Sequence, residues 1–564
     1  MSFQNILRRR PLVVAGGITA SGAAAIEYYS DYQEKHAVNK EEYKYSLPRS
    51  YDRQTFRSYW IRRPVSVVSR FGEIGYQLSP TLASYLFHKN SPRWLSSRST
   101  PSGHINNVNG NNDDDNDDEK LRRQQSVQLR EALTNLGPAF VKVGQQVAIR
   151  PDLVPASVLK ELQKLCDSVR PVPDEVAMQV LREELSGMGM DRQSKGRKSN
   201  DGEEQQKRIE TPKINLDDIF EDLHLVASAS LGQVYKAKLR TSGDLVAIKV
   251  QRPGMERAFS LDLFLLQMWG DFMDTFTNTF TKQIPYHSAF FDAFSKGSYS
   301  ELDYENEASN QMHFQRELAI RNCKVKVPNV YEEYSTRRVL TSEWIEGVKL
   351  ADSSRETIRE LIPIGVELFL TQLLDMGTFH SDPHPGNLLV TQDGTLCLID
   401  FGLCAEVEVR EREAMTKAIV HLLYRDFDTL IHTDTKELGF LPHDFDTEEL
   451  KPILTKVLTG GLLQSGSDLT KRKRKLMEIS NELNEIFFRY PFRVPGFFAL
   501  VTRGLGLLEG IALVGDPDFD IFMASAPYAT KRAVSILGQQ ATGYRGLSRV
   551  LTRPINTNKI SPNV

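Results

Sequence analysis

The stretch that decides the fold is His380-Ser381-Asp382-Pro383-His384-Pro385-Gly386-Asn387. An acid stands two residues after a histidine, and an amide stands five residues after the acid. This is the H-x-D-x-x-x-x-N spacing of a phosphoryl-transfer catalytic loop. Such chemistry needs a carboxylate that orients or deprotonates the nucleophile, and we assign this role to Asp382. It also needs an oxygen ligand for Mg²⁺, which Asn387 can supply.

A short apolar run, Leu396-Cys397-Leu398-Ile399, follows this loop and predicts a buried strand. It leads directly into Asp400-Phe401-Gly402, so Asp400 would be a second carboxylate for the metal. Either motif alone is weak evidence, but here both occur in order and within the length of a hairpin. A proline-rich turn whose polar side chains bond only to their own backbone would not explain the second acid.

From Leu225 onward the pattern changes to short strands. Residues 226–237 predict a strand, a turn of small residues and a second strand, and Gly243-Asp244 predicts a hairpin. The following strand carries Lys249 in a V-A-I-K context, which is typical of a lysine that binds phosphates. The turn would cover the nucleotide with a single glycine, and the residues assigned to it are Ala227, Ser228, Ala229, Ser230 and Gly232.

Two further segments complete the predicted nucleotide site. Residues 301–308, with the sequence ELDYENEA, predict the acid-rich start of a helix. We select Glu307 over Glu301 as the partner of Lys249. Residues 339–347 predict a strand that ends at a glycine, as in a hinge between two lobes, and the backbone around Glu343 and Trp344 would meet the adenine edge.

The composition is that of an ordinary folded protein that is too long for one core. The chain has 564 residues, of which 40% are hydrophobic and 25% are charged, so two or three units are expected. A net charge of −3, without a basic stripe interleaved with aromatics, argues against a nucleic-acid partner. The four cysteines have no C-x-x-C spacing and indicate neither a zinc site nor a disulfide framework.

The N-terminus predicts delivery to an organelle. Arg8-Arg9-Arg10 precedes an uncharged run at residues 11–26, and no acid appears before Glu27, as is typical of a presequence. The run is slightly shorter than the roughly 20 residues that span a bilayer, so a single span and a cleaved targeting peptide both stay open. A spanning run would place the rest of the chain across the membrane from the matrix or stroma.

Three segments before residue 225 have distinct compositions. Residues 43–95 predict a helical extension that packs on the main domain or lies on a membrane surface. Residues 96–120 are rich in Ser, Gly, Asn and Asp and predict a disordered linker, since they cannot bury enough apolar surface. A polar, mixed-charge run at residues 185–215 predicts an exposed insertion.

A helix–helix boundary lies between the linker and the insertion. Gly137 would end one helix and Pro138 would open the next. On the second helix Lys142 and Gln145 share a face at i, i+3, and Gly144 allows another backbone to approach closely.

Together these motifs resemble the UbiB family of atypical kinases, also called the ADCK group. The resemblance extends over roughly residues 51–533, and two C-terminal stretches, Tyr490–Pro495 and Leu508–Pro517, are similar to the plastid and cyanobacterial branch. The motifs that carry it are Lys142-x-Gly144-Gln145, the Ala/Ser turn, Val246–Lys249, Glu301-x-Asp303, His380–Asn387 and Asp400–Gly402.

The resemblance implies an α+β fold, bilobal and protein-kinase-like, with an added N-terminal helical Lys-x-Gly-Gln subdomain and a helical C-lobe. The expected divisions are a targeting or transmembrane segment at 1–42, the helical extension at 43–95, the linker at 96–120, the helical subdomain at 121–224, an N-lobe at 225–345, a C-lobe at 346–535 and a tail at 536–564.

By position, the resemblance also implies the role of each site residue. ATP or ADP and Mg²⁺ are the expected cofactors. Lys249 and Glu307 would hold the phosphates, Asp382 would be the catalytic acid, and Asn387 and Asp400 would bind the metal. A regulatory lid would be formed by Lys142, Gly144, Gln145, Glu301 and Asp303. The chain has Ser228 where the family prefers alanine.

The implied function is that of an ATP- and Mg²⁺-dependent atypical kinase or ATPase that supports quinone or prenyl-lipid metabolism. The expected place is an organelle membrane, first the mitochondrial inner membrane and alternatively a plastid membrane, with an isoprenoid quinone or related lipid and lipid-biosynthesis proteins as partners. One alternative is a scaffold that binds nucleotide with weak catalysis. The other is a conventional serine/threonine kinase, against which the lack of an A-P-E sequence argues.

Overall fold

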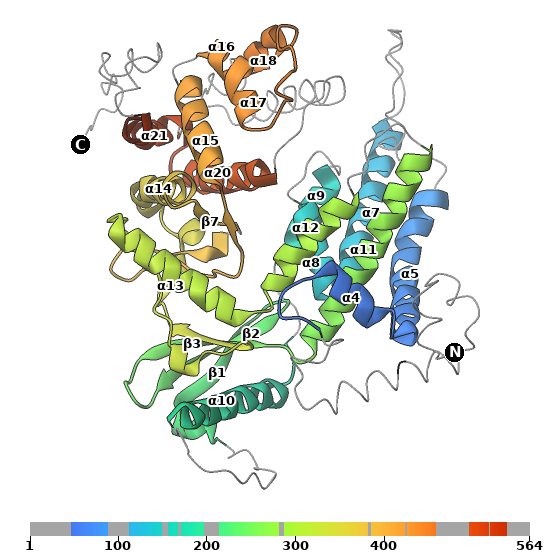
Figure 1. The fold of residues 1–564 in the computed structure, drawn as a ribbon, viewed down its shortest axis with the longest axis vertical. Helices are drawn as coiled ribbons and strands as arrows, with labels where there is room; N and C mark the ends of the chain where they lie inside the picture. The colour runs from blue at the N-terminus through green and yellow to red at the C-terminus, as the bar shows by residue number, and fades with distance from the viewer. Residues whose placement is uncertain are drawn as a thin grey trace. The chain divides into compact units, whose positions relative to one another are not determined.

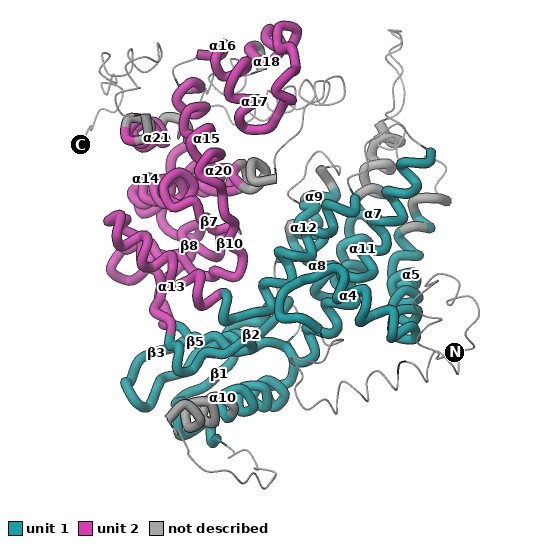
Figure 2. The backbone as a smooth tube through the Cα atoms, in the orientation of Figure 1, with its two compact units in different colours: residues 1–306, 331–342 teal, residues 307–330, 343–564 magenta. Residues whose placement is uncertain are grey.

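The computed structural model describes residues 27, 47–87, 112–148, 156–166, 171–196, 214–280, 287–381, 385–423, 426–457, 496–517, 519 and 521–537. They belong to two compact units (Figure 2). Unit 1 contains residues 1–306 and 331–342, and unit 2 contains residues 307–330 and 343–564. Residues 307–330, which we assigned to the N-lobe, therefore belong to unit 2, because Phe314 and Leu318 are buried in its core.

Unit 1 holds a four-stranded sheet in the order β1-β2-β3-β5. Its strands are β1 (Phe220–Ser228), β2 (Gly232–Leu239), β3 (Leu245–Gln251) and β5 (Val339–Glu343). β1–β2 and β2–β3 pair antiparallel. Because side chains alternate along a strand, Val246, Ile248 and Val250 are buried in a core shared with α10 (Asp174–Gly196). Lys249 therefore lies on the opposite face of β3.

The helices of unit 1 surround a second core (Figure 1). Gly137, with φ +101°, separates α7 from α8 as predicted, and Pro138 opens α8. Arg70 of α5 bonds to Asp262 of α11, with Nε 2.7 Å from Oδ1. The helices are α4 (Arg53–Trp60), α5 (Pro64–Phe87), α7 (Asn112–Leu136), α8 (Pro138–Val147), α9 (Ala156–Leu162), α11 (Met255–Phe280) and α12 (His287–Ser300).

Two predicted segment boundaries are wrong. α7 begins at Asn112, so residues 112–120 of the predicted linker are helical, and an acidic run suits the partial positive charge of a helix N-terminus. α10 continues to Gly196, so the predicted insertion starts too early, and Leu185 is buried against the sheet. The predicted span at residues 11–26 and the predicted helix at 469–488 lie outside the described residues.

Unit 2 contains α13 (Tyr304–Ile320) from Glu307 onward and two small sheets. In the first, β4 pairs parallel to β9, while β8 pairs antiparallel to both β9 and β6. In the second, β7 pairs antiparallel to β10. The strands are β4 (Val325–Lys326), β6 (Gly347–Lys349), β7 (Thr378–His380), β8 (Leu388–Thr391), β9 (Leu396–Leu398) and β10 (Cys404–Glu406).

Helices supply most of the core of unit 2. α14 is followed directly by a π-helical turn at Thr371–Met376, and α20 packs along α14. Residues Val501, Leu508, Ile511 and Ala512 of α20 are buried in this core, as expected for a globular helix. The helices are α14 (Arg355–Leu370), α15 (Val409–Leu423), α16 (Phe427–Thr429), α17 (Thr435–Glu437), α18 (Lys451–Val457), α20 (Gly496–Gly515) and α21 (Ile521–Leu537).

Within the described residues, no helix combines the length and the apolar character that crossing a membrane requires.

The contact between α14 and α20 predicts a difference between two glycines of α20. A methyl group at Gly504 would overlap the ring of Phe369, whereas one at Gly506 would meet nothing within 4 Å. Gly504→Ala should lower the free energy of unfolding by about 1–3 kcal/mol through overpacking. Gly506→Ala should raise it by roughly 0.5–1 kcal/mol through helix propensity. Urea unfolding of both variants checks this, and equal midpoints would contradict the packing of α20 on α14.

Candidate nucleotide and metal site

Asp400 occupies an unusual backbone conformation at the end of a buried strand. Leu396, Cys397 and Leu398 of β9 are at most 4% exposed, and two residues later Asp400 has φ +64°. The amide of Gly402 donates to Asp400 Oδ1 at 3.3 Å. A left-handed conformation is uncommon for a residue other than glycine and persists where its surroundings enforce it, often at functional sites. The predicted metal ligand is therefore presented by a constrained turn.

Contacts on both sides of Asp400 enforce this turn. Nε2 of His380 donates to the backbone carbonyl of Asp400, and Asn310 Nδ2 donates to the carbonyl of Phe401 at 3.1 Å. The fully buried ring of Phe401 packs edge-on against His380, with centroids 5.7 Å apart, and lies tilted against Phe314, with centroids 5.1 Å apart. The catalytic loop and α13 thus hold the same short segment.

The ends of the catalytic loop are anchored next to this segment. The amide of His380 donates to Gln372 Oε1 at 2.9 Å, and the amide of Ser381 donates to the carbonyl of Leu403 at 3.0 Å. After the loop, the carbonyl of Asn387 accepts from the amide of Ile399 at 3.0 Å. The predicted metal ligands Asn387 and Asp400 therefore come from adjacent segments. Asp382 lies outside the described residues, so its role stays a prediction.

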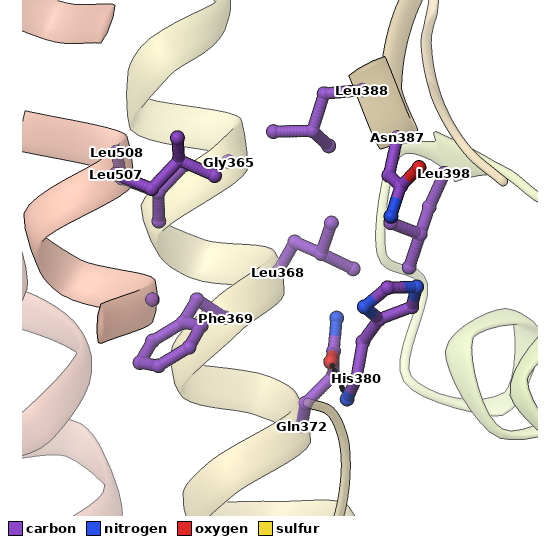
Figure 3. Close-up of a pocket in the computed structure, with 11 residues that line it drawn as sticks. Gly365, Leu368, Phe369, Gln372, His380, Asn387, Leu388, Leu398, Leu507 and Leu508 are labelled. Atoms are coloured by element: carbon purple, nitrogen blue, oxygen red, sulfur yellow. Dashed lines mark hydrogen bonds between the residues drawn. The ribbon is translucent and has the colours of Figure 1, made fainter. Parts of the chain in front are cut away.

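A small cavity lies behind the loop (Figure 3). Its volume is about 40 Å³, which is room for one or two water molecules and far too little for a nucleotide. His380, Gln372 and Asn387 line one side, whereas the helices α14 and α20 line the other with apolar groups. This cavity lies where the loop packs on the helices, and it is not the predicted nucleotide pocket.

Glu307 and Asp400 bring two carboxylates to one place in unit 2. A methyl group on Gly402 would lie 3.4 Å from Asp400 Oδ1 and 3.5 Å from Glu307 Oε2. Burial, together with the negative charges of these two carboxylates, raises the pKa of the nearby Cys404 thiol to about 12. Carboxylate and amide oxygens are the ligands that Mg²⁺ prefers, so Asp400 and Asn387 have the chemistry for this ion. No group of three or more His, Cys, Asp or Glu side chains suited to a metal occurs within the described chain, which omits Asp382.

In unit 1 the lysine on β3 lies above an aromatic ring. Lys249 Nζ is 5.1 Å from the ring centroid of Tyr304, which is fully buried. Glu307, the predicted partner of Lys249, belongs to unit 2, so this pairing stays a prediction. Glu301, the rejected candidate, forms an ion pair with Lys142 instead.

Two of the predicted lid residues contact each other, and the other three form contacts with other parts of the chain. Lys142 and Glu301 form an ion pair whose side chains are 15% and 9% exposed. Gln145 donates to the carbonyl of Leu165 at 3.3 Å. Gly144 packs where a methyl group would overlap the Leu165 side chain. Asp303 Oδ1 accepts from the amide of Glu305 at 3.1 Å, so it caps α13, as expected of an acid at a helix start.

The Ala/Ser turn is closed by an arginine that the motif analysis did not select. The amide of Ala229 donates to the carbonyl of Gly232 at 2.8 Å. Arg252, directly after β3, donates from Nη2 to Ser228 Oγ at 2.9 Å and from Nε to the carbonyl of Ala229 at 3.2 Å. Ser228 therefore has a partner that an alanine would lack. A basic residue at the end of the lysine strand was the available signal.

In the predicted hinge, the side chain of Glu343 forms contacts that the sequence did not predict. Glu343 accepts from Asn329 Nδ2 at 3.1 Å and pairs with Lys326, and its amide donates to the carbonyl of Asn329 at 2.8 Å. Its side chain thus fixes the segment after β4. The part of Glu343 and Trp344 in binding adenine stays a prediction.

The sequence is similar to a family of kinase-like proteins. A family model described as the ABC1 atypical kinase-like domain matches residues 200–433. The Arabidopsis thaliana protein ACTIVITY OF BC1 COMPLEX KINASE 3, chloroplastic, is 36% identical over 423 residues, which cover 74% of this chain and 54% of that protein. The uncharacterized protein slr1919 of Synechocystis sp. is 35% identical over 499 residues, which cover 86% and 76%.

A further relative and a solved structure are also similar to this chain. The Arabidopsis thaliana protein ACTIVITY OF BC1 COMPLEX KINASE 1, chloroplastic, is 34% identical, with 72% of this chain and 56% of that protein covered. The chain spans about half the length of these chloroplastic relatives. The structure of the Rv3197–erythromycin complex from Mycobacterium tuberculosis matches at 22% identity with a TM-score of 0.46, covering 73% of this chain and 97% of that one.

The family model spans the residues that carry the motifs at 249, 380–387 and 400–402, and the relatives match over most of the chain. They confirm the predicted kinase-like α+β fold and the likeness to the plastid and cyanobacterial branch. The chain belongs to the ABC1 atypical kinase-like family.

Proposed function

We propose that this protein is an ATP- and Mg²⁺-dependent atypical kinase or ATPase that acts on, or helps to extract, isoprenoid quinone-type lipids at an organelle membrane. The observation that supports the phosphoryl-transfer part is the Asp400 turn, where the residue that carries the proposed metal-binding carboxylate has a left-handed backbone and its carbonyl accepts a hydrogen bond from His380. Asp222 and Asn322 also have positive φ, so the feature that supports the proposal is the bond between the Asp400 carbonyl and His380.

Each site residue has a role in this proposal. Asp400 and Asn387 would hold Mg²⁺, which when bound neutralises phosphate charge. Lys249 would add a positive charge at the phosphates, Glu307 would hold Lys249, and Asp382 would place the nucleophile. The Ala/Ser turn, braced by Arg252, would cover the phosphates.

The proposed lipid substrate and the proposed membrane are supported by other observations than the site geometry. Members of the family that the motifs resemble serve quinone and prenyl-lipid metabolism. The names of the Arabidopsis relatives include the word chloroplastic, which supports a plastid membrane over the mitochondrial inner membrane. Lipid-biosynthesis proteins remain proposed partners.

A second candidate function is a nucleotide-binding scaffold with weak catalysis. The observation that favours it is the largely buried ion pair between Lys142 and Glu301, since a closed lid would restrict access to the acceptor site. Phosphate release from ATP by purified protein, with and without liposomes and a quinone-precursor mimic, separates the two. Turnover stimulated by lipid supports the enzyme, whereas binding without turnover supports the scaffold.

The metal assignment predicts the behaviour of Asp400→Asn. This variant should lose the Mg²⁺-dependent rise in melting temperature that ATP produces in the parent protein, because ligand binding stabilises only the state that binds it. Asp393→Asn is the matched control, since this exposed acid in the β8–β9 hairpin accepts hydrogen bonds from the hydroxyls of its neighbours Thr391 and Thr395. A nucleotide shift that survives in Asp400→Asn would contradict the assignment.

The lid assignment predicts unequal effects of two substitutions on α8. Lys142→Ala removes the ion pair with Glu301 and should raise autophosphorylation or ATP turnover by roughly tenfold, corresponding to a coupling of about 1–3 kcal/mol. Gln145→Ala removes only a bond to the Leu165 carbonyl and should change the rate less. Initial rates and melting temperatures are measured together. A Lys142→Ala protein that melts earlier but turns over at the parent rate would show a purely structural ion pair.

A further inference from the structure

We propose that Tyr304 is the positioning residue that connects the Lys142–Glu301 lid to Lys249. The inference rests on the proposed function in one respect, namely that Lys249 binds phosphate. Its basis is a short turn in unit 1, residues 301–304, that contacts the lid helix at one end and the strand lysine at the other.

The contact with the lysine is a cation–π interaction. Lys249 Nζ lies 5.1 Å from the ring centroid of Tyr304, within the roughly 6 Å at which an ammonium is attracted to the face of an aromatic ring. The ring is fully buried, so it is a fixed surface for a side chain that otherwise has four rotatable bonds. Tyr304 therefore limits where the ammonium of Lys249 can point.

The position of the ring is itself determined by the sheet. The amide of Tyr304 donates to the carbonyl of Arg337 at 3.0 Å, and Gln251 Nε2, at the end of β3, donates to the carbonyl of Leu302 at 2.8 Å. A methyl group at Gly232 would overlap the Tyr304 hydroxyl and would lie 2.7 Å from the carbonyl oxygen of Val250. Gly232, the single glycine of the Ala/Ser turn, thus leaves room for the side chain of Tyr304 next to the strands.

The lid contacts the same turn in two ways. Glu301 pairs with Lys142 of α8. Ala139 of α8, Leu231 of the nucleotide turn and Leu302 belong to one hydrophobic cluster. Because interior packing is close, displacement of α8 cannot leave the turn unchanged. Loss of the ion pair would move residues 301–304 and, through the ring, Lys249. The lid would then act on the chemistry of the phosphate lysine as well as on access to the site.

The test observes Lys249 directly and needs no nucleotide. Reductive ¹³C-methylation keeps the charge of the ammonium, and the Lys249 signal is assigned by its loss in Lys249→Arg. An ammonium held over a ring face gives an upfield-shifted methyl signal. We expect this shift in the parent and in Tyr304→Phe, its loss in Tyr304→Leu, and an altered shift in Lys142→Ala. A Lys249 signal that is the same in the parent and in Tyr304→Leu would overturn the contact.

Nucleotide binding by the same variants tests the functional part. Tyr304→Leu should weaken ATP binding by roughly two- to thirtyfold, the range of a cation–π contact, with Tyr304→Phe restoring most of the affinity and circular dichroism confirming the fold of both. The effects of Lys142→Ala and Tyr304→Leu should not be additive. Additive effects would overturn the coupling. A parent protein that binds no ATP would instead refute the proposed function, with the methyl signals still deciding the contact.

Discussion

The site depends on one hydrogen bond, from Nε2 of His380 to the backbone carbonyl of Asp400. It joins the predicted catalytic loop to the turn that presents Asp400, the predicted metal ligand, and it stabilises a backbone conformation that costs roughly 1–3 kcal/mol in a residue other than glycine. A carbonyl can only accept, so the imidazole must carry its proton on Nε2. The ring also packs against Phe401, which closes the turn from the side of the core.

The residues to which the proposal gives roles belong to two different units of the chain. Unit 2 holds the proposed metal ligands Asp400 and Asn387, and the carboxylate of Glu307 approaches Gly402 together with that of Asp400. Unit 1 holds the cation, Lys249, on the face of β3 that does not pack against α10. Unit 1 also holds the Lys142–Glu301 ion pair and Tyr304. The proposed control of the lysine by the lid therefore involves residues of unit 1, and the proposed metal ligands are residues of unit 2.

Local sequence patterns were sufficient for the features that depend on few neighbours. The spacing of the catalytic loop, the buried strand before Asp400 and the Gly137-Pro138 boundary all follow from residues close in the chain. Contacts between distant segments were not predictable in this way. Gln145 bonds to Leu165, and Arg252 closes the Ala/Ser turn, because tertiary packing selects among several available partners.

Two features that the sequence analysis did not predict have specific physical causes. Residues 112–120 looked disordered because their composition is polar, yet they begin the long helix α7, whose later turns pack against α5 and α8. Asp303, which the motif assigns to the lid, also caps α13 because it stands directly before that helix, and its part in the lid stays a prediction. Asn310 lies three residues after Glu307 and so on the same helical face, but its contact with Phe401 joins distant segments and could not be predicted from this spacing.

The most direct measurement is an experimental structure of the protein with Mg²⁺ and a non-hydrolysable ATP analogue. The account predicts a metal bound by Asp400 and Asn387, the ammonium of Lys249 at the phosphates, and the Ala/Ser turn over them. A nucleotide bound elsewhere, or a metal that contacts neither Asp400 nor Asn387, would contradict it.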